Sequence, residues 1–303
     1  NLFCRRFDNN GRRGMIFYIL YRVGYLLANI LPLKLAYSLA KRVSYIQYIL
    51  SKKDRNAVVQ NLGIITKKDV KECQKLAMKV FRNFGLYLVD FFRISSLSKE
   101  DIKKRVKVEG IENIDGVLKQ NKGGIILTCH IGNWEMGGVV MAMLGYDISA
   151  VVLNHKHKNI NDFFIKQREE KGLKVIPIDH IMKRCVSALR RKGLLAIAGD
   201  RDFTNNGIIM DFFGMPTSIP KGPAMFSLKT DSPIIPGFLI RRDSFNYSLI
   251  FDKPMYLKET PGMDKDEIMK EANKKFVASM EKCIRAYPDQ WLIFRKFWET
   301  PVD

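Results

Sequence analysis

A histidine and a glutamate lie five positions apart in the segment IILTCHIGNWE, where His130 follows a short apolar run and Glu135 ends the segment. The apolar run predicts a buried strand and the residues after Gly132 predict a helix, so the glycine marks a turn between them. On a continuous helix, residues five apart point about 140° away from each other, and a turn removes that obstacle. A carboxylate that holds one imidazole nitrogen leaves the other free to take a proton from an attacking hydroxyl. The pair therefore predicts general-base chemistry at the carboxyl end of a strand.

The same spacing recurs at His157 and Asp162, but in a polar, lysine-rich stretch with no buried strand before it. This setting predicts a solvated loop, in preference to a second catalytic pair or a metal site at His155 and His157. Cys129 directly precedes the first histidine. Because neighbouring residues on a strand point to opposite faces, this thiol is not placed to share a proton with His130, and we expect a small core residue.

A second polar cluster, Gly-Asp-Arg-Asp at residues 199–202, follows the apolar run 194–198. Ligands and catalytic groups of open α/β sheets collect at the carboxyl ends of strands. Asp200 and Arg201 therefore lie near His130 if the two strands are neighbours. Two interpretations stay open: a buried structural ion pair, or a role in orienting catalytic groups and binding an anionic headgroup.

The elements that would position these residues alternate along the chain, short apolar runs with helical patterns. Such alternation indicates βα units, so the predicted fold class is α/β, with a mixed, largely parallel central sheet flanked by helices. The last two strands are expected to form an antiparallel hairpin. The predicted strands cover residues 106–108, 125–128, 148–153, 173–176, 194–198, 234–241 and 246–251. The predicted helices cover residues 67–93, 111–121, 134–144, 159–171, 181–192 and 264–286. The first of these helices is expected to begin with a capping box from Thr66 to Asp69.

Residues 15–50 form two apolar stretches that are separated by Pro32 and interspersed with basic side chains. They predict either a helical hairpin that covers the core or a membrane-embedded or interfacial anchor. We favour the anchor, because each basic residue near an anionic leaflet contributes ~1 kcal/mol and tyrosines suit a membrane interface. The predicted division is residues 1–50 as N-terminal membrane-anchoring or interfacial helices and residues 51–303 as the main domain. The side chains behind this preference are Arg5, Arg6, Arg12, Arg13, Tyr18, Tyr21 and Tyr25.

Charge is the least ordinary feature of the composition, since 51 lysines and arginines against 31 acidic residues give a formal net charge of +20. Such an excess favours anionic partners, for example an acidic lipid surface or an acidic carrier protein. The basic residues are spread along the whole chain without a recognisable reader motif, so no nucleic-acid partner is predicted. The five cysteines are scattered and include no CxxC pair, which argues against a disulfide framework or a zinc module.

Several protein classes are disfavoured because their sequence signals are missing. No uninterrupted apolar segment reaches the roughly 18 residues of a confident spanning helix, and no signal-peptide cleavage site is evident. The glycines lack the spacing and the Lys-Ser/Thr ending of a phosphate-binding loop. The Gly-x-Ser-x-Gly elbow of α/β hydrolases is also missing.

As an ordered set, the motifs resemble those of the bacterial lipid A late acyltransferases, which include lauroyl and myristoyl transferases, and those of the related phosphatidylinositol mannoside acyltransferases. The resemblance runs from about residue 15 to the end of the chain. It is carried by TCHIGNWE (128–135), GDRD (199–202), FFG (212–214), PKGPA (220–224) and YPDQW (287–291).

The resemblance implies transfer of a fatty acyl chain from an acyl-thioester, usually acyl carrier protein and otherwise acyl-CoA, to a hydroxyl of a glycolipid such as a lipid A precursor. His130 would be the general base and Glu135 its orienting partner, in an acyltransferase domain at residues 51–303. No metal or other cofactor is implied, and the expected location is the cytoplasmic face of the bacterial inner membrane. The expected substrate-binding residues are Asn133, Arg168, Asp200, Arg201 and Lys221. Candidate walls of an acyl groove, with core packing as the equal alternative, are Met210, Phe212, Phe213 and Met215.

Two departures from the family pattern leave the acceptor open. The family often carries a histidine before Arg-Arg/Lys-Phe near the C-terminus, where this chain reads WLIFRKF at residues 291–297. Asp-Arg-Asp at residues 200–202 stands where lipid A enzymes often have Asp-Gln, and is closer to the mannoside acyltransferases. The alternatives are therefore a phosphatidylinositol mannoside or lysophospholipid-type acyltransferase, or a non-catalytic membrane scaffold of the same fold.

Overall fold

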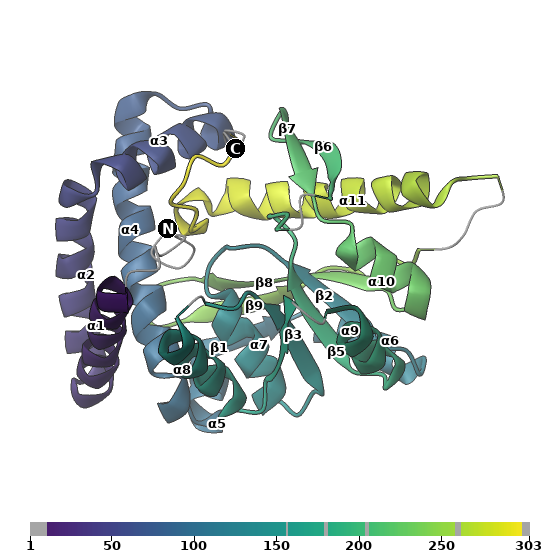
Figure 1. Cartoon of the computed structure of the whole chain (residues 1–303), viewed down its shortest axis with the longest axis horizontal. Coiled ribbons are helices and arrows are strands. Elements are labelled where there is room, and N and C mark those ends of the chain that lie inside the picture. Colours follow the sequence, from purple (N-terminus) through teal and green to yellow (C-terminus); the bar gives the residue numbers. More distant parts are fainter. Residues whose placement is uncertain (1–10, 156, 179–180, 204–205, 258–261, 299–303) are drawn as a thin grey trace.

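The computed structural model describes residues 11–155, 157–178, 181–203, 206–257 and 262–298, with side chains from residue 15 onward (Figure 1). Of the predicted basic flank, Arg5 and Arg6 lie outside the described residues. Arg12 and Arg13 lie in the first helix, at positions where only the backbone is described.

Four helices open the chain, and the first two confirm the predicted helical stretches on either side of Pro32. The third is not evident from the sequence, because its buried positions include the polar Asp54 and Asn61. The fourth begins at Asp69, whose carboxylate accepts a hydrogen bond from the Glu72 N–H at 2.8 Å. The predicted capping box is wrong, since the Thr66 hydroxyl donates backward within the preceding helix. These helices are α1 (Gly11–Ile30), α2 (Leu33–Leu50), α3 (Lys52–Thr66) and α4 (Val70–Phe92).

Seven strands form one sheet in the order β1-β9-β8-β2-β5-β3-β4. Neighbours run parallel except β8 and β9, which are antiparallel. The mixed, largely parallel sheet and the hairpin near the end of the chain are therefore confirmed. The strands are β1 (Val106–Glu109), β2 (Gly124–Thr128), β3 (Ile148–Val152), β4 (Lys174–Pro177), β5 (Leu194–Ala198), β8 (Ile234–Arg241) and β9 (Tyr247–Phe251).

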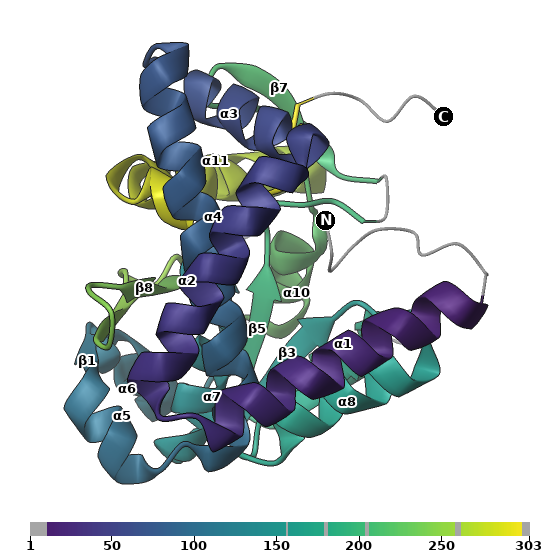
Figure 2. The same ribbon diagram turned by 90° about the vertical axis from the view of Figure 1, so that its left-hand side faces the viewer.

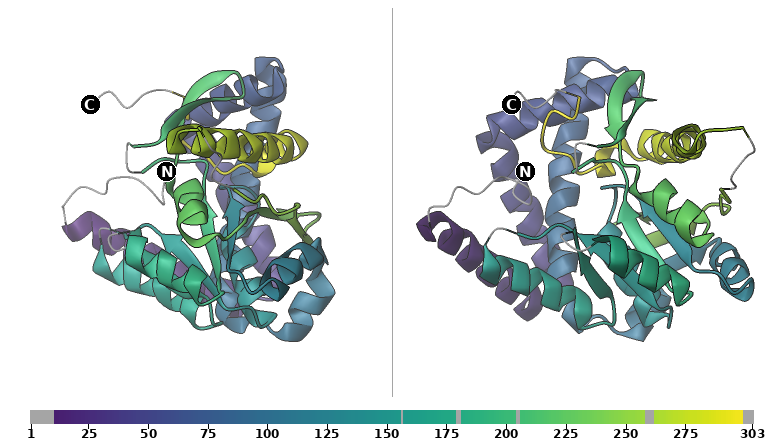
Figure 3. Two further views of the ribbon diagram at one scale, coloured as in Figure 1. Left: turned by 90° about the vertical axis from the view of Figure 1, so that its right-hand side faces the viewer. Right: turned by 45° about the vertical axis from the view of Figure 1, so that its right-hand side comes forward.

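Helices cover both faces of this sheet, which is the middle layer of the molecule (Figures 1 and 3). On β2, Ile126 packs into one buried cluster together with α4, α6, α7 and α8. Its neighbours Ile125 and Leu127 pack into a second cluster with α9, α10 and α11, as the alternation of side chains along a strand requires. The remaining helices are α5 (Lys99–Arg105), α6 (Ile111–Lys119), α7 (Trp134–Met143), α8 (Lys158–Glu169), α9 (Ile181–Arg190), α10 (Gly222–Thr230) and α11 (Lys265–Ala286), with short 3-10 turns η1 (Ile94–Ser96) and η3 (Pro288–Gln290).

A separate antiparallel hairpin, β6 (Ile208–Phe212) and β7 (Met215–Ile219), stands away from the sheet beside α11 (Figure 1). The chain reverses between the two strands at Phe213 and Gly214, both with positive φ. Glycine adopts this conformation without strain and closes the turn.

Helices α1 and α2 lie on one side of the molecule, α1 beside α8 and α2 beside α4 (Figure 2). The tyrosines of α1 face inward: Tyr21 is buried, with its ring 5.4 Å from that of Phe164, and the Tyr25 ring lies 5.6 Å from that of Phe163. Tyr18 also packs against the core. Tyr21 is therefore part of the core, whereas Tyr18 and Tyr25 are half-buried, and the predicted membrane interface of residues 15–50 stays a prediction.

The outward side of the same two helices is aliphatic. None of the helices in the described part of the chain is both long and apolar enough to span a membrane. The exposed aliphatic side chains are Ile16, Ile19, Leu20, Val23, Leu26, Leu27 and Ile30 on α1, and Leu35, Leu39, Val43, Ile46, Ile49 and Leu50 on α2.

Candidate active site

A cavity of about 460 Å³ lies at the carboxyl ends of β2, β3 and β5, with His130 in its wall. Residues of α4, α7, α8, α9 and α10, the stretch after β5 and the segment 292–294 contribute the rest of the wall, which is mostly apolar. Open α/β sheets bind their ligands at this edge. The cavity is therefore where a substrate would meet the histidine.

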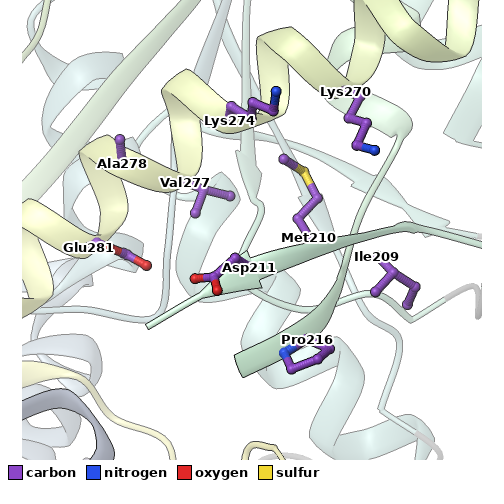
Figure 4. Close-up of a pocket in the computed structure, with 9 residues that line it drawn as sticks. All are labelled: Ile209, Met210, Asp211, Pro216, Lys270, Lys274, Val277, Ala278 and Glu281. Carbon is purple, nitrogen blue, oxygen red and sulfur yellow. The ribbon is translucent and has the colours of Figure 1, made fainter. Parts of the chain in front are cut away.

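The four predicted groove-wall residues lie elsewhere. Met210 lines a different groove, of about 530 Å³, between the β6–β7 hairpin and α11 (Figure 4). Phe212 and Phe213 are buried in the core, as the alternative of core packing predicts, and Met215 is exposed. None of the four residues lines the cavity at His130. The lining of this second groove includes no histidine or cysteine, so the candidate chemistry belongs to the cavity at His130.

Strand pairing brings His130 and Asp200 together. Strands β2 and β5 are parallel neighbours with Thr128 opposite Ala198, and each chain continues two residues to the polar side chain. His130 Nδ1 lies 2.7 Å from Asp200 Oδ1, and the His130 backbone N–H donates to Oδ2 at 3.1 Å. The indole N–H of Trp291 donates to the same Oδ2 at 3.1 Å. Asp200 thus holds His130 through both the imidazole ring and the backbone N–H.

The carboxylate of Asp200 is completely buried and ionised. Burial raises its pKa, but the interactions with His130 and the hydrogen bond from Trp291 outweigh burial, so the pKa lies below the ordinary value. An ionised carboxylate accepts a proton donor, which assigns the hydrogen to Nδ1 and leaves Nε2 as a proton acceptor.

Glu135 pairs with Arg168, not with His130. Arg168 Nε lies 2.7 Å from Oε2 and Nη2 lies 2.6 Å from Oε1, which is a bidentate ion pair between the first turn of α7 and helix α8. Burial lowers the pKa of Arg168 but the charge of Glu135 outweighs it, and the pKa is raised. The predicted role of Glu135 as the carboxylate on the imidazole is therefore wrong: Asp200 holds Nδ1, and both oxygens of Glu135 are taken by the guanidinium.

Aromatic side chains hold the histidine and the ion pair in place. The Trp134 ring stacks on Tyr87 at 4.8 Å and meets the His130 ring edge-on at 5.0 Å. The Arg168 guanidinium lies over the Phe164 ring, 5.8 Å from its centre. These contacts restrict the rotamers of the polar groups, as a preorganised site requires.

The other predicted substrate-binding residues divide into two groups. Arg201 and Lys221 line the cavity, the former with its guanidinium 4.5 Å from the centre of the Phe203 ring. Asn133 is buried, and its side-chain oxygen accepts from the Met136 N–H at 3.1 Å as the N-cap of α7. Asn133 is not among the cavity's lining residues, so the structure gives it a capping role in place of the predicted contact with substrate.

His155 was not predicted, because its lysine-rich surroundings indicate a solvated loop. It lines the cavity, and its ring lies 4.8 Å from that of Phe164. Burial, followed by the charge of Arg168, lowers its pKa from 6.5 to about 4, so the ring is neutral at physiological pH. The signal in the sequence that could have found it is the end of the apolar run 148–153, which places the residue just beyond strand β3.

Cys129 is a fully buried core residue, as predicted, and burial raises the pKa of its thiol well above the ordinary value. A thiol that is not ionised is a poor nucleophile. In the described part of the chain, no three His, Cys, Asp or Glu side chains group closely enough to hold a metal ion.

Comparison with known proteins gives a family. The sequence profile described as "Bacterial lipid A biosynthesis acyltransferase" matches residues 8–300. The chain belongs to this family. The match includes the His130–Asp200 pair, the Glu135–Arg168 pair and the helices α1 and α2.

Individual relatives within this range are distant. A phosphatidylinositol mannoside acyltransferase of Mycobacterium tuberculosis is 26% identical over 160 residues, which is 51% of this chain and 51% of the relative. The protein of the same name from Mycolicibacterium smegmatis is 24% identical over 158 residues, 51% of this chain and 52% of the relative. A lipid A biosynthesis palmitoleoyltransferase of Escherichia coli K12 is 24% identical over 234 residues, 76% of this chain and 74% of the relative. The chain thus matches about half the length of the mycobacterial proteins and about three quarters of the enterobacterial one.

Proposed function

We propose that this protein is an O-acyltransferase that moves a fatty acyl chain from a thioester, carried by acyl carrier protein, to a hydroxyl of a glycolipid such as a lipid A precursor. The observation that carries the proposal is a histidine with its Nδ1 held by a buried, ionised carboxylate, in the wall of a largely apolar cavity. Family membership supports the same reaction class.

In the proposed reaction, Nε2 of His130 takes the proton of the acceptor hydroxyl while its oxygen attacks the thioester carbonyl carbon. Asp200 stabilises the imidazolium that forms, since it is ionised and hydrogen-bonded to Nδ1. The tetrahedral intermediate collapses, the carbon–sulfur bond breaks, and the leaving thiolate takes the proton from the imidazolium. The products are an ester on the glycolipid and a free thiol, and His130 is neutral again.

Small side chains provide room for the acyl chain beside the histidine. Ala150 on β3 and Ala196 on β5 are paired across the two strands and line the cavity. Gly138 on α7 and Leu173 also belong to the lining. A methylene chain is therefore expected to extend from the thioester at His130 into this apolar part of the cavity.

Positive groups in the cavity suit the charged ends of the substrates. Arg201 and Lys221 line it, and Lys221 lies 3.7 Å from the Asp266 carboxylate at the surface. We assign Arg201 to the developing oxyanion or to a phosphate of the acceptor, because a guanidinium matches both. The Glu135–Arg168 pair is assigned to fixing α7 against α8, which keeps the His130 turn in place.

The exposed aliphatic residues of α1 and α2 are proposed to insert into the cytoplasmic face of the bacterial inner membrane. Thirteen such side chains share this side of the molecule, and Arg22, Lys34 and Arg42 stand exposed among them. An apolar face bordered by basic residues is typical of helices that lie in the interface of an anionic membrane. This arrangement would bring the cavity to a lipid acceptor.

The test is acyl transfer from a radiolabelled palmitoyl-carrier protein to purified glycolipids, in detergent micelles, by the wild type and by His130→Ala. We expect the variant to lose about 10²–10⁴-fold in kcat, the range for a general base. His157→Ala is the matched control, because this histidine lies outside the cavity lining. Equal activity of wild type and His130→Ala would contradict the mechanism. No transfer by the wild type to any lipid A precursor or phosphatidylinositol mannoside would favour a non-catalytic role.

A further inference from the structure

Helix α9 and the residues just after it carry charge of a single sign. Between residues 181 and 192 there are five basic residues and no acidic one. All five side chains are exposed. Lys174 at the start of β4 and Lys229 near the end of α10 are exposed on neighbouring elements. We call this set the α9 basic face; its members are Lys174, Lys183, Arg184, Arg190, Arg191, Lys192 and Lys229.

The fold does not require this charge. The inward side of α9 is satisfied by Cys185, Val186, Ala188 and Leu189, which are buried against the sheet. The outward positions need only be polar, yet between residues 181 and 192 they carry five basic side chains and no acidic one. Lys174 at the edge of the face pairs with Asp147 at 2.6 Å. In the described part of the chain, Lys183, Arg184, Arg190 and Lys229 form no salt bridge, so their charges are available to an external anion.

The groove beside α11 shows the ordinary alternative. Its lysines, Lys270 and Lys274, stand among the carboxylates of Asp211 and Glu281, and Lys274 pairs with Glu271 (Figure 4). Charges there are balanced within the protein. The α9 basic face therefore carries a local excess of positive charge, which the net charge of the whole chain alone does not explain.

The α9 basic face begins where the wall of the cavity ends. Ile181 and Met182, in the first turn of α9, line the cavity that contains His130. Met182 also lines an adjoining surface hollow together with Lys183, Arg190 and Lys229. A partner bound on the basic face would thus be beside the edge of the cavity.

The same face lies away from the aliphatic side of α1 and α2. In Figure 1 these two helices are at the left of the molecule, whereas α9 is at the right of the sheet, and the view in Figure 2 has α1 and α2 in front. A protein seated on a membrane by α1 and α2 leaves α9 to the aqueous side. This position favours a soluble anionic partner over a lipid headgroup.

We propose that the α9 basic face is the docking surface for an acidic acyl carrier protein, which delivers its thioester past Met182 to His130. The inference rests on the proposed function and adds the surface that selects the donor. Complementary charge steers such encounters and sets their orientation. Basic residues from β4, α9 and α10 together suit a protein surface, whereas acyl-CoA has its few charges on one small nucleotide.

The test compares two donors, palmitoyl-carrier protein and palmitoyl-CoA, with the full chain in micelles. The variant Lys183→Glu/Arg190→Glu/Lys229→Glu reverses the basic face around the hollow. The control Lys270→Glu/Lys275→Glu/Lys282→Glu makes the same change in net charge on α11, at exposed positions away from the cavity lining. We expect kcat/KM with the carrier protein to fall about 10-fold or more at low salt in the first variant only, and kcat/KM with palmitoyl-CoA to change less than about 2-fold. The difference should shrink as salt is added.

Equal losses with both donors, or equal losses in both variants, would overturn the docking surface. Binding of unacylated carrier protein, measured by calorimetry, needs no turnover and separates this inference from the proposed function. Wild-type binding that the first variant loses supports the surface even if no glycolipid is acylated. Absence of wild-type binding overturns it even if acyl transfer occurs. Loss of sedimentation with phosphatidylglycerol vesicles in the first variant, with carrier binding intact, would make the face a membrane contact and also overturn it.

Discussion

Two buried carboxylates in this molecule, Asp200 and Asp90, have similar surroundings and different consequences. Asp200 is completely buried and Asp90 nearly so, and each accepts several hydrogen bonds from side chains of distant elements. Asp200 lies beside a cavity, and its partner His130 retains Nε2 as a proton acceptor. Asp90 lies on α4 with partners on α2, β8 and β9, away from the cavity lining.

The partners of Asp90 offer no unused proton acceptor at a cavity. The hydroxyls of Tyr37 and Tyr247 and the guanidinium of Arg241 all donate to it, and Arg105 lies 3.7 Å away. Burial, followed by the charge of Asp90, raises the pKa of both tyrosines, so their hydroxyls remain donors. The comparison teaches that a buried carboxylate points to catalysis when its partner retains an unused proton acceptor at a cavity.

The comparison makes its strongest prediction at Asp200. Asp200→Asn removes the charge that stabilises the imidazolium and the acceptor that fixes the Nδ1 hydrogen, so kcat should fall roughly 10²–10⁴-fold. KM for the glycolipid should change little, since Asp200 is buried behind the histidine. Steady-state kinetics with labelled thioester measures both. A variant with unchanged kcat would remove Asp200 from the mechanism.

At Asp90 the effect should be on stability. Asp90→Asn leaves the buried charge of Arg241 without its carboxylate, and we expect a loss of about 3–5 kcal/mol in the free energy of unfolding. Acyl transfer per folded molecule should persist at low temperature. Denaturant unfolding and transfer assays at about 10 °C separate the two quantities.

Asp231→Asn is the control for this variant. It also removes an ion-paired carboxylate, that of the exposed Asp231–Lys122 pair, and should cost no more than about 1 kcal/mol. A similar loss in both variants would mean that burial is not what makes the Asp90 cluster important.

Protonation of His155, a residue of the cavity wall, should make the free energy of unfolding depend on pH. Its pKa is about 4 in the folded protein and 6.5 in the unfolded reference, so below pH 6.5 the unfolded chain binds the additional proton. Stability from this group is complete above pH 6.5 and falls as pH decreases to about 4, by a total of ~3 kcal/mol. In His155→Gln this part of the acid loss should disappear. Unfolding free energies at pH 7, 5.5 and 4.5 for both proteins test this, and parallel curves would contradict it.

The smallest effect concerns a helix end far from either carboxylate. Asp69→Ala removes the N-cap of α4 and should cost about 1 kcal/mol in the free energy of unfolding, with no change in kcat. Lys71→Ala, two residues further along the first turn and without a capping contact, is the matched control. A change in kcat would show that α4 transmits more to the cavity than packing alone predicts.

The α/β class, the sheet strands and the position of His130 at a strand end could be predicted, because apolar runs and the glycine turn are local signals. The partner of His130 could not, because whether β2 neighbours β5 depends on long-range pairing that no local pattern encodes. Arg168 was predicted from the family resemblance, but its partner Glu135 depends on how α7 packs on α8. The orientation of Tyr21 was misjudged for a related reason: an amphipathic residue suits both a membrane interface and a core, and only the position of α8 decides.

That contact of Tyr21 has a practical consequence. The Phe164 ring touches Tyr21 of α1 and also lies against Arg168 and His155, which line the cavity. Helix α1 is therefore connected to the wall of the cavity through the Phe164 ring. A shortened form made for easier purification, starting at residue 33, would not be a trimmed enzyme with an intact centre. It would expose Phe163 and Phe164 to water, and the residues that such trimming is meant to leave untouched would lose their support.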